Sequence, residues 1–186
     1  MTNDEIQKLD FSEWPLPDDY LVEIGRVAAL WSGLESLMNM CIGKLAGFND
    51  LYDPTPFILI THSSFPQRLD MFSTFCERLH VKFPSLTGYD EVIGKLKSAQ
   101  KLRNKLMHHG LAFDADSGAA RMSIGSARGS LKTTVREVKI ADLRRAVLSI
   151  DEAQRALYQL VFKRKIPPAW KKRSVKQPSP EGSSKV

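Results

Sequence analysis

The chain has 186 residues, of which 42% are hydrophobic, and a formal net charge of +6. This length suits one domain with a single core, and the composition excludes a chain that is disordered throughout. The longest purely apolar runs, such as residues 27–31 and 57–60, are far shorter than the ~18 to 20 residues that span a bilayer. We therefore expect a globular domain without a transmembrane segment.

The net positive charge is concentrated near the C-terminal end of the sequence. From Lys165 onward there are six Lys or Arg residues against one Glu, which leaves the rest of the chain close to neutral. Because residues 165–186 are too poor in apolar residues to fold alone, we predict a basic, disordered tail there. The first residues are acidic and no apolar signal region follows them, so we expect a cytoplasmic protein that makes no membrane contact.

An irregular lead-in and a long helix are predicted at the start of the chain. Residues 1–17 end in a Trp-Pro-Leu-Pro run, in which each proline disfavours helix at the residue before it. Over residues 18–47, apolar side chains recur in alternating steps of four and three. This spacing predicts an amphipathic helix that ends near Gly47.

Three more helices and a β insertion are predicted after it. Ser64 and Gln67 have the spacing of a capping box and precede a second helix. Helical periodicity returns over residues 92–110 and again over 140–161. Over residues 111–138, short apolar stretches alternate with turns rich in Gly, Ser and Asp, which predicts two or three short strands.

These elements predict a mainly α fold, an antiparallel four-helix bundle with a small β-hairpin insertion between the third and fourth helices. The helices can bury their apolar stripes only against each other, which favours a bundle over residues 18–164 with the insertion at about 111–138. Cys41 and Cys76 lie in helical stretches without metal-ligand spacing. We interpret both cysteines as small buried hydrophobic side chains.

Two charged residues fall within the predicted apolar stripes. On a helical wheel of about 100° per residue, Arg103 lies in the middle of the apolar stripe of the third helix. Glu35 is the only acidic residue in an apolar sector of the first helix. A centrally placed arginine needs a fixed anionic partner, so we predict that Glu35 pairs with Arg103. Such a pair either only fixes the register of the helices or holds the guanidinium ready for a phosphate.

An amide and an imidazole follow Arg103 at the end of the third helix. Asn104 and His108 are four residues apart, and His108 lies about 140° round the helix from Arg103, with Asn104 between them. Arginine supplies a permanent charge and a fork that matches phosphate oxygens, and histidine takes up and returns a proton near neutral pH. This set of side chains is suited to cleaving RNA.

The chain here resembles the HEPN superfamily (higher eukaryotes and prokaryotes nucleotide-binding), helical domains whose signature is Arg, then Asn, Asp or His, three further residues, and His. Arg103, Asn104 and His108 match these three positions. The sequence Trp-Ser-Gly-Leu-Glu over residues 31–35 is similar to the Trp-x-x-Leu-Glu pattern of HEPN relatives. The resemblance covers roughly residues 20–163.

The resemblance implies a metal-independent endoribonuclease, often a toxin or defence effector, in which two protomers bring their Arg/His faces together in one cleft. His108 would act on the ribose 2′-hydroxyl or the leaving 5′-oxygen, Arg103 would neutralise the phosphorane, and Asn104 would orient the phosphate or His108. Glu35 would support Arg103. The product would be a 2′,3′-cyclic phosphate.

The expected partners are a second copy of the chain, RNA, and an antitoxin or another protein, and no cofactor is expected. An alternative reading is a non-catalytic HEPN-like module for nucleic-acid binding, protein binding or dimerisation, because many members of the superfamily are reported to lack nuclease activity. A third reading is a structural homodimer without a ligand. Fold alone does not distinguish these functions.

Other polar residues near the predicted site have two interpretations each. His109 is either a second acid/base or a side chain favoured by the helix dipole near a C-terminus. Basic side chains on the third helix and the β insertion either contact an RNA backbone or keep a strand edge solvated: these are Lys101, Lys105, Arg121, Arg128, Lys132 and Arg136. No metal site is expected, because no two histidines have the helical spacing of metal ligands.

Overall fold

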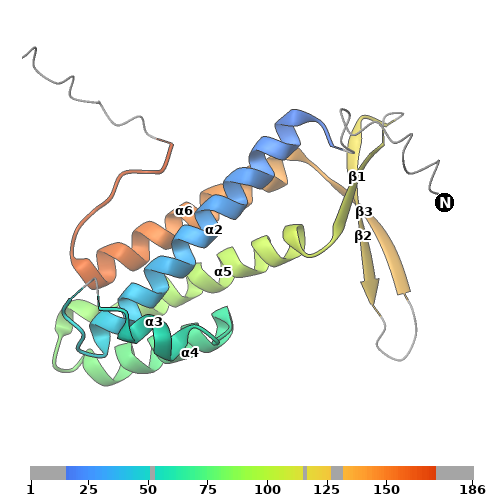
Figure 1. Cartoon of the computed structure of the whole chain (residues 1–186). Coiled ribbons are helices and arrows are strands. Elements are labelled where there is room, and N and C mark those ends of the chain that lie inside the picture. The colour runs from blue at the N-terminus through green and yellow to red at the C-terminus, as the bar shows by residue number, and fades with distance from the viewer. Residues whose placement is uncertain (1–15, 51–52, 115–116, 127–131, 171–186) are drawn as a thin grey trace, which may run out of the picture.

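A computed structural model describes residues 16–50, 53–114, 117–126 and 132–170. The chain is mainly helical and carries one three-stranded antiparallel sheet of order β1-β2-β3 (Figure 1). The elements in chain order are α2 (Asp18–Leu45), α3 (Thr55–Ile60), α4 (Phe65–Leu79), the 3-10 helix η1 (Pro84–Leu86), α5 (Tyr89–Met107), β1 (Gly110–Asp114), β2 (Ala119–Ser126), β3 (Lys132–Val138) and α6 (Ile140–Phe162). Among the described residues, no helix has the length and apolar character needed to cross a membrane.

The four predicted helices correspond to α2, α4, α5 and α6, and the predicted β insertion to the sheet. The capping box is confirmed: the backbone N–H of Ser64 donates to Oε1 of Gln67 at 2.7 Å, at the start of α4. The elements α3 and η1 were not predicted. Each is too short to show a helical period in the sequence.

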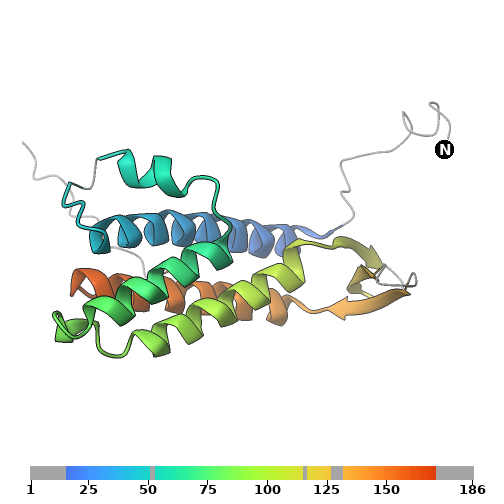
Figure 2. The same cartoon turned by 90° about the horizontal axis from the view of Figure 1, so that it is seen from below.

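The directions of the helices differ from the expected antiparallel bundle. Figures 1 and 2 show α2 and α6 side by side and running in the same direction, away from the sheet, while α5 runs toward the sheet. In Figure 2, α3 carries the chain back along α2, so that α4 starts again near the middle of α2 and shares its direction. The simple antiparallel order is therefore not confirmed, because α3 adds a return that the sequence pattern does not show.

The core lies between α2, α4, α5 and α6. Its fully buried side chains include Val27, Leu34 and Met38 of α2, Phe72 of α4, Leu96 of α5, and Leu143, Ile150 and Leu157 of α6. Cys41 and Cys76 are free, buried thiols within it, which confirms their interpretation as hydrophobic side chains. Burial in this apolar core raises the pKa of the Cys76 thiol to about 12 and also raises that of Cys41.

The sheet stands at the end of the helices where α5 leads into β1 and β3 leads into α6 (Figure 1). Ala120, Met122 and Val138 are its buried residues among those described, and they belong to the core. The hydroxyl of Tyr20, in the first turn of α2, donates to the carbonyl oxygen of Val138 at 3.0 Å. This bond ties the start of α2 to the end of β3, so the sheet is fixed on the helices beside the C-terminal end of α5.

Close packing of α3 on α2 gives a first testable expectation. A Cβ at Gly43 would lie 2.9 Å from both Cβ and Cγ of Pro56, in α3. Gly43→Ala is therefore expected to lower the free energy of unfolding by about 1 to 3 kcal/mol, as overpacking does. Urea denaturation measures this change.

The matched control is Gly94→Ala in α5. A Cβ there meets nothing within 4 Å, so this substitution is expected to raise the free energy of unfolding by about 0.5 to 1 kcal/mol, the helix-propensity gain. Equal effects of the two substitutions would show that α3 does not pack against Gly43 as described.

Candidate active site

The structure brings Arg103, Asn104 and His108 together at the C-terminal end of α5. One guanidinium nitrogen of Arg103, Nη1, donates to Nε2 of His108 at 2.7 Å and to Oδ1 of Asn104 at 3.2 Å. On an ideal helix His108 would lie about 140° away from Arg103. The two side chains meet because the helix ends at Met107 and His108 leaves it, with φ −104° and ψ 6°.

The hydrogen bond places the Nε2 edge of His108 against the guanidinium. A guanidinium has five N–H donors and no acceptor, so Nε2 of His108 is the acceptor in this contact. The side chain of His108 is exposed to solvent at the end of the helix, where a substrate could reach it.

The indole ring of Trp31 packs against the guanidinium of Arg103. The Cζ of Arg103 lies 5.5 Å from the ring centroid of Trp31, on α2, in a cation–π contact. Trp31 is only 6% exposed and packs on Phe65, the first residue of α4, with ring centroids 4.6 Å apart. Helices α2, α4 and α5 therefore all contribute to the position of one guanidinium.

The predicted ion pair between Glu35 and Arg103 is wrong. Among the ion pairs between described residues, none joins these two side chains, although both are half-buried. The electron-rich face of Trp31, one turn before Glu35, takes the place of the carboxylate. A guanidinium near the end of a helix also keeps part of its surface in water, so it does not need a buried anion.

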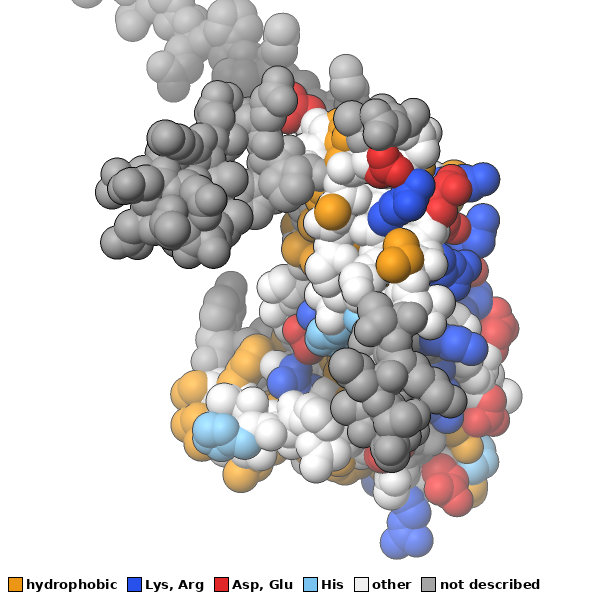
Figure 3. Space-filling model, turned by 90° about the vertical axis from the view of Figure 1, so that its right-hand side faces the viewer, with side chains coloured by type: hydrophobic (Ala, Val, Ile, Leu, Met, Phe, Trp, Pro, Cys, Tyr) orange, Lys and Arg blue, Asp and Glu red, His pale blue; other side chains and the backbone are white. Residues whose placement is uncertain are grey.

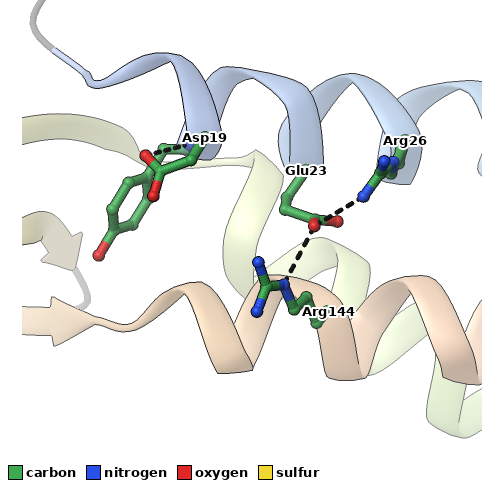
Figure 4. A network of polar contacts seen from close by, with 5 residues as sticks. Asp19, Glu23, Arg26 and Arg144 are labelled. Carbon is green, nitrogen blue, oxygen red and sulfur yellow. Dashed lines mark hydrogen bonds and ion pairs between the residues drawn. The ribbon is translucent and has the colours of Figure 1, made fainter.

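Among the described residues, the buried acidic side chains are those of Glu23 and Asp151, neither of which was predicted as buried. Oε1 of Glu23 accepts from Nη1 of Arg26 at 2.8 Å and from Nε of Arg144 at 3.1 Å (Figure 4). Asp151 accepts from Nε of Arg155 at 2.7 Å. Both acids continue the steps of three and four in the apolar stripe of their own helix, and this signal could have found them.

Two of the basic residues proposed to contact RNA, Lys105 and Arg136, line one small pocket together with the acidic Glu137 and Asp142. Lys101 is exposed, Lys105 is half-buried, and Arg121 is paired with Asp114 across the first hairpin. On the face shown in Figure 3, Lys and Arg side chains along one edge alternate with Asp and Glu side chains. The acidic side chains between the basic ones weaken the attraction of this edge for a phosphate backbone.

Other predicted residues lie around or outside the described site. His109 is half-buried in the turn between α5 and β1, and Arg136 is exposed on β3. Arg128 lies outside the described residues, and so do 1–15 of the predicted lead-in and 171–186 of the predicted tail. Lys132 is the first residue of β3, but its side chain is not among those described.

Neither a metal-binding cluster among the described residues nor a matched relative accompanies the site at the end of α5. Within the part of the chain that the structure describes, no group of three or more His, Cys, Asp or Glu side chains could hold a metal ion. Comparisons with protein-family models, curated proteins and solved structures gave no match.

Proposed function

We propose that this chain is a HEPN-like helical domain that cleaves RNA without a metal ion, as a toxin or defence effector. The observation that carries the proposal is the 2.7 Å hydrogen bond between Arg103 and His108 at an exposed helix end. It places a permanent cation and an imidazole side by side, the pair that cleavage by a 2′-hydroxyl needs. The order of the long helices, with a β insertion before the last, also agrees with the HEPN resemblance.

In the proposed reaction, the scissile phosphate binds Arg103. The guanidinium then donates to the phosphate oxygens and releases Nε2 of His108. Nε2 of His108 then accepts the proton of the ribose 2′-hydroxyl, and the 2′-oxygen attacks phosphorus. Arg103 stabilises the negative charge of the phosphorane, while Asn104 orients a phosphate oxygen. The bond to the 5′-oxygen breaks, this oxygen takes up a proton from water, and His108 passes its own proton to the solvent. The products are a 2′,3′-cyclic phosphate and a 5′-hydroxyl.

The test is cleavage of a pool of structured and single-stranded RNAs in the presence of EDTA. We expect fragments with 2′,3′-cyclic phosphate ends, because the 2′-hydroxyl is the nucleophile. DNA of the same sequences lacks that hydroxyl and should stay intact. RNA that remains intact at a large excess of protein, or cleavage that leaves 3′-hydroxyl ends, would contradict the proposal.

The same proposal predicts a homodimer that includes the end of α5. One chain presents its Arg103, Asn104 and His108 on its surface, and a two-fold contact would set a second copy of these residues opposite the first. Light scattering at micromolar concentration should therefore give twice the mass of one chain. A strict monomer under these conditions would contradict a composite site.

A non-catalytic binding module is the second candidate, and one observation favours it. Arg103, Asn104 and His108 already bond to one another, so the base nitrogen of His108 is occupied within a single chain. In a binding module, this cluster would hold RNA or a protein partner such as an antitoxin. Binding of RNA without cleavage, by the wild-type protein and equally by the His108→Ala variant, would favour the module.

A further inference from the structure

A groove of about 670 Å³ lies between α2 and α6 and shares no residue with the Arg103 site. Its walls are mainly apolar: Ala29 and Leu30 of α2, Val147 and Leu148 of α6, and Trp170. Leu148 is 53% exposed and Trp170 is 51% exposed, so large apolar side chains face solvent here. Contiguous apolar surface of this kind on a folded chain is typical of interaction sites.

Basic side chains line one part of this groove. Glu23 is almost fully buried and accepts from both Arg26 and Arg144, whose side chains are 58% and 63% exposed (Figure 4). Two guanidinium groups against one carboxylate leave an excess positive charge at the rim of the groove. Because Glu23 holds both groups in place, their remaining N–H donors are oriented toward solvent at little entropic cost.

The Trp170 wall is anchored to the body of the domain. The backbone N–H of Ala169, beside Trp170, donates to Oδ1 of Asp151 at 2.9 Å. Asp151 is 3% exposed and is also bonded to Arg155 on its own helix. A buried carboxylate thus holds the backbone of the segment after α6 at Ala169, next to Trp170 in the groove wall.

We propose that this groove binds an amphipathic, acidic helix of a partner protein. A groove between two parallel helices accepts the apolar stripe of a third helix. Leu148 and Trp170 supply exposed apolar contacts for that stripe. Carboxylates flanking the stripe would meet Arg26 and Arg144, which supplies the charge complementarity. The mainly apolar lining favours a protein over a nucleic acid, because nucleic-acid sites are strongly polar and positively charged.

The experiment uses the full chain and two synthetic helical peptides with the same Leu and Trp stripe. One peptide carries Glu on both flanks of the stripe and the other carries Lys, and fluorescence anisotropy measures binding of each. We expect the Glu peptide to bind at least about tenfold more tightly than the Lys peptide. Added salt should reduce the difference in affinity between the two peptides, because it screens the charges of exposed guanidinium groups.

Substitutions then locate the binding in the groove. Arg144→Ala should weaken binding of the Glu peptide about tenfold, while Arg145→Ala, the matched control on the next residue, should change it by less than about twofold. Leu148→Lys should also weaken binding about tenfold or more, whereas Val81→Lys at another exposed apolar position should not. Leu148 is exposed, so this variant is expected to fold even if Arg144→Ala does not.

Each other outcome overturns the proposal. These outcomes are equal affinities for the two peptides, no binding of the Glu peptide at about 1 mM, and unchanged binding by the Leu148→Lys variant. If Leu148→Lys converts a dimer to a monomer in sedimentation, the groove is covered by a second copy. If an RNA oligonucleotide competes with the Glu peptide and loses affinity in Arg144→Ala, the occupant is RNA.

Discussion

Replacing His108 by Ala is expected to lower the rate of RNA cleavage by about 10²- to 10⁴-fold, the usual contribution of a positioned acid or base. RNA binding should change little, because the imidazole acts on the proton of the 2′-hydroxyl and adds little ground-state affinity. His108 is exposed, so its loss leaves the core intact. Single-turnover cleavage and filter binding measure the two effects separately.

The neighbouring histidine provides the matched control. His109→Ala changes the same kind of side chain one residue later, in the turn between α5 and β1, and should retain most of the activity, because it is His108 that contacts Arg103. Arg103→Ala should reduce both cleavage and binding, because the guanidinium contacts the phosphate in both states. Cleavage at an undiminished rate by the His108→Ala variant would remove His108 from the mechanism.

Replacing Trp31 by Ala should be the most damaging substitution for the fold near the site. Loss of a buried tryptophan lowers the free energy of unfolding by about 3 to 5 kcal/mol, since the lost contacts leave a cavity. Trp31 also lies under Arg103, so cleavage by the folded fraction should fall as well. Urea denaturation, monitored by circular dichroism, measures the change in the free energy of unfolding.

The conservative variant separates packing from support of the guanidinium. Trp31→Phe keeps an aromatic ring against Phe65 and should recover a large part of the stability. It offers Arg103 a weaker cation–π partner, because the indole is the best of the aromatic rings for this contact. If Trp31→Ala lowered the stability by less than about 1 kcal/mol, the described packing of Trp31 between α2, α4 and α5 would be incorrect.

The long helices could be predicted because their apolar side chains repeat with the period of a helix. The capping box at Ser64 and the turn residues of the β insertion mark boundaries by local chemistry, and these also agree with the structure. The direction of α4 could not be predicted in this way. It depends on α3, a single short helix whose residues show no period of their own and whose position is decided by packing against α2.

The candidate site divides in the same way between local and distant contacts. Arg103, Asn104 and His108 are neighbours in the sequence, so a helical wheel is enough to group them. The partner of Arg103 lies on another helix. A helical wheel predicts only which face of a helix is buried, and not which residue of the neighbouring helix contacts a given side chain. Trp31 and Glu35 are one turn apart on α2, and the predicted partner Glu35 was wrong because the guanidinium contacts Trp31.

The two partners of the Arg103–His108 hydrogen bond are held by different parts of the molecule. Arg103 lies within α5 and packs on Trp31 of α2, which in turn packs on Phe65 of α4. His108 follows the end of α5 and lies two residues before β1, which begins at Gly110. The position of His108 is therefore set from two sides, by the end of α5 and by the sheet, which the Tyr20–Val138 bond holds against the start of α2. The spacing of the two groups thus depends on where the sheet is held as well as on how the helices pack.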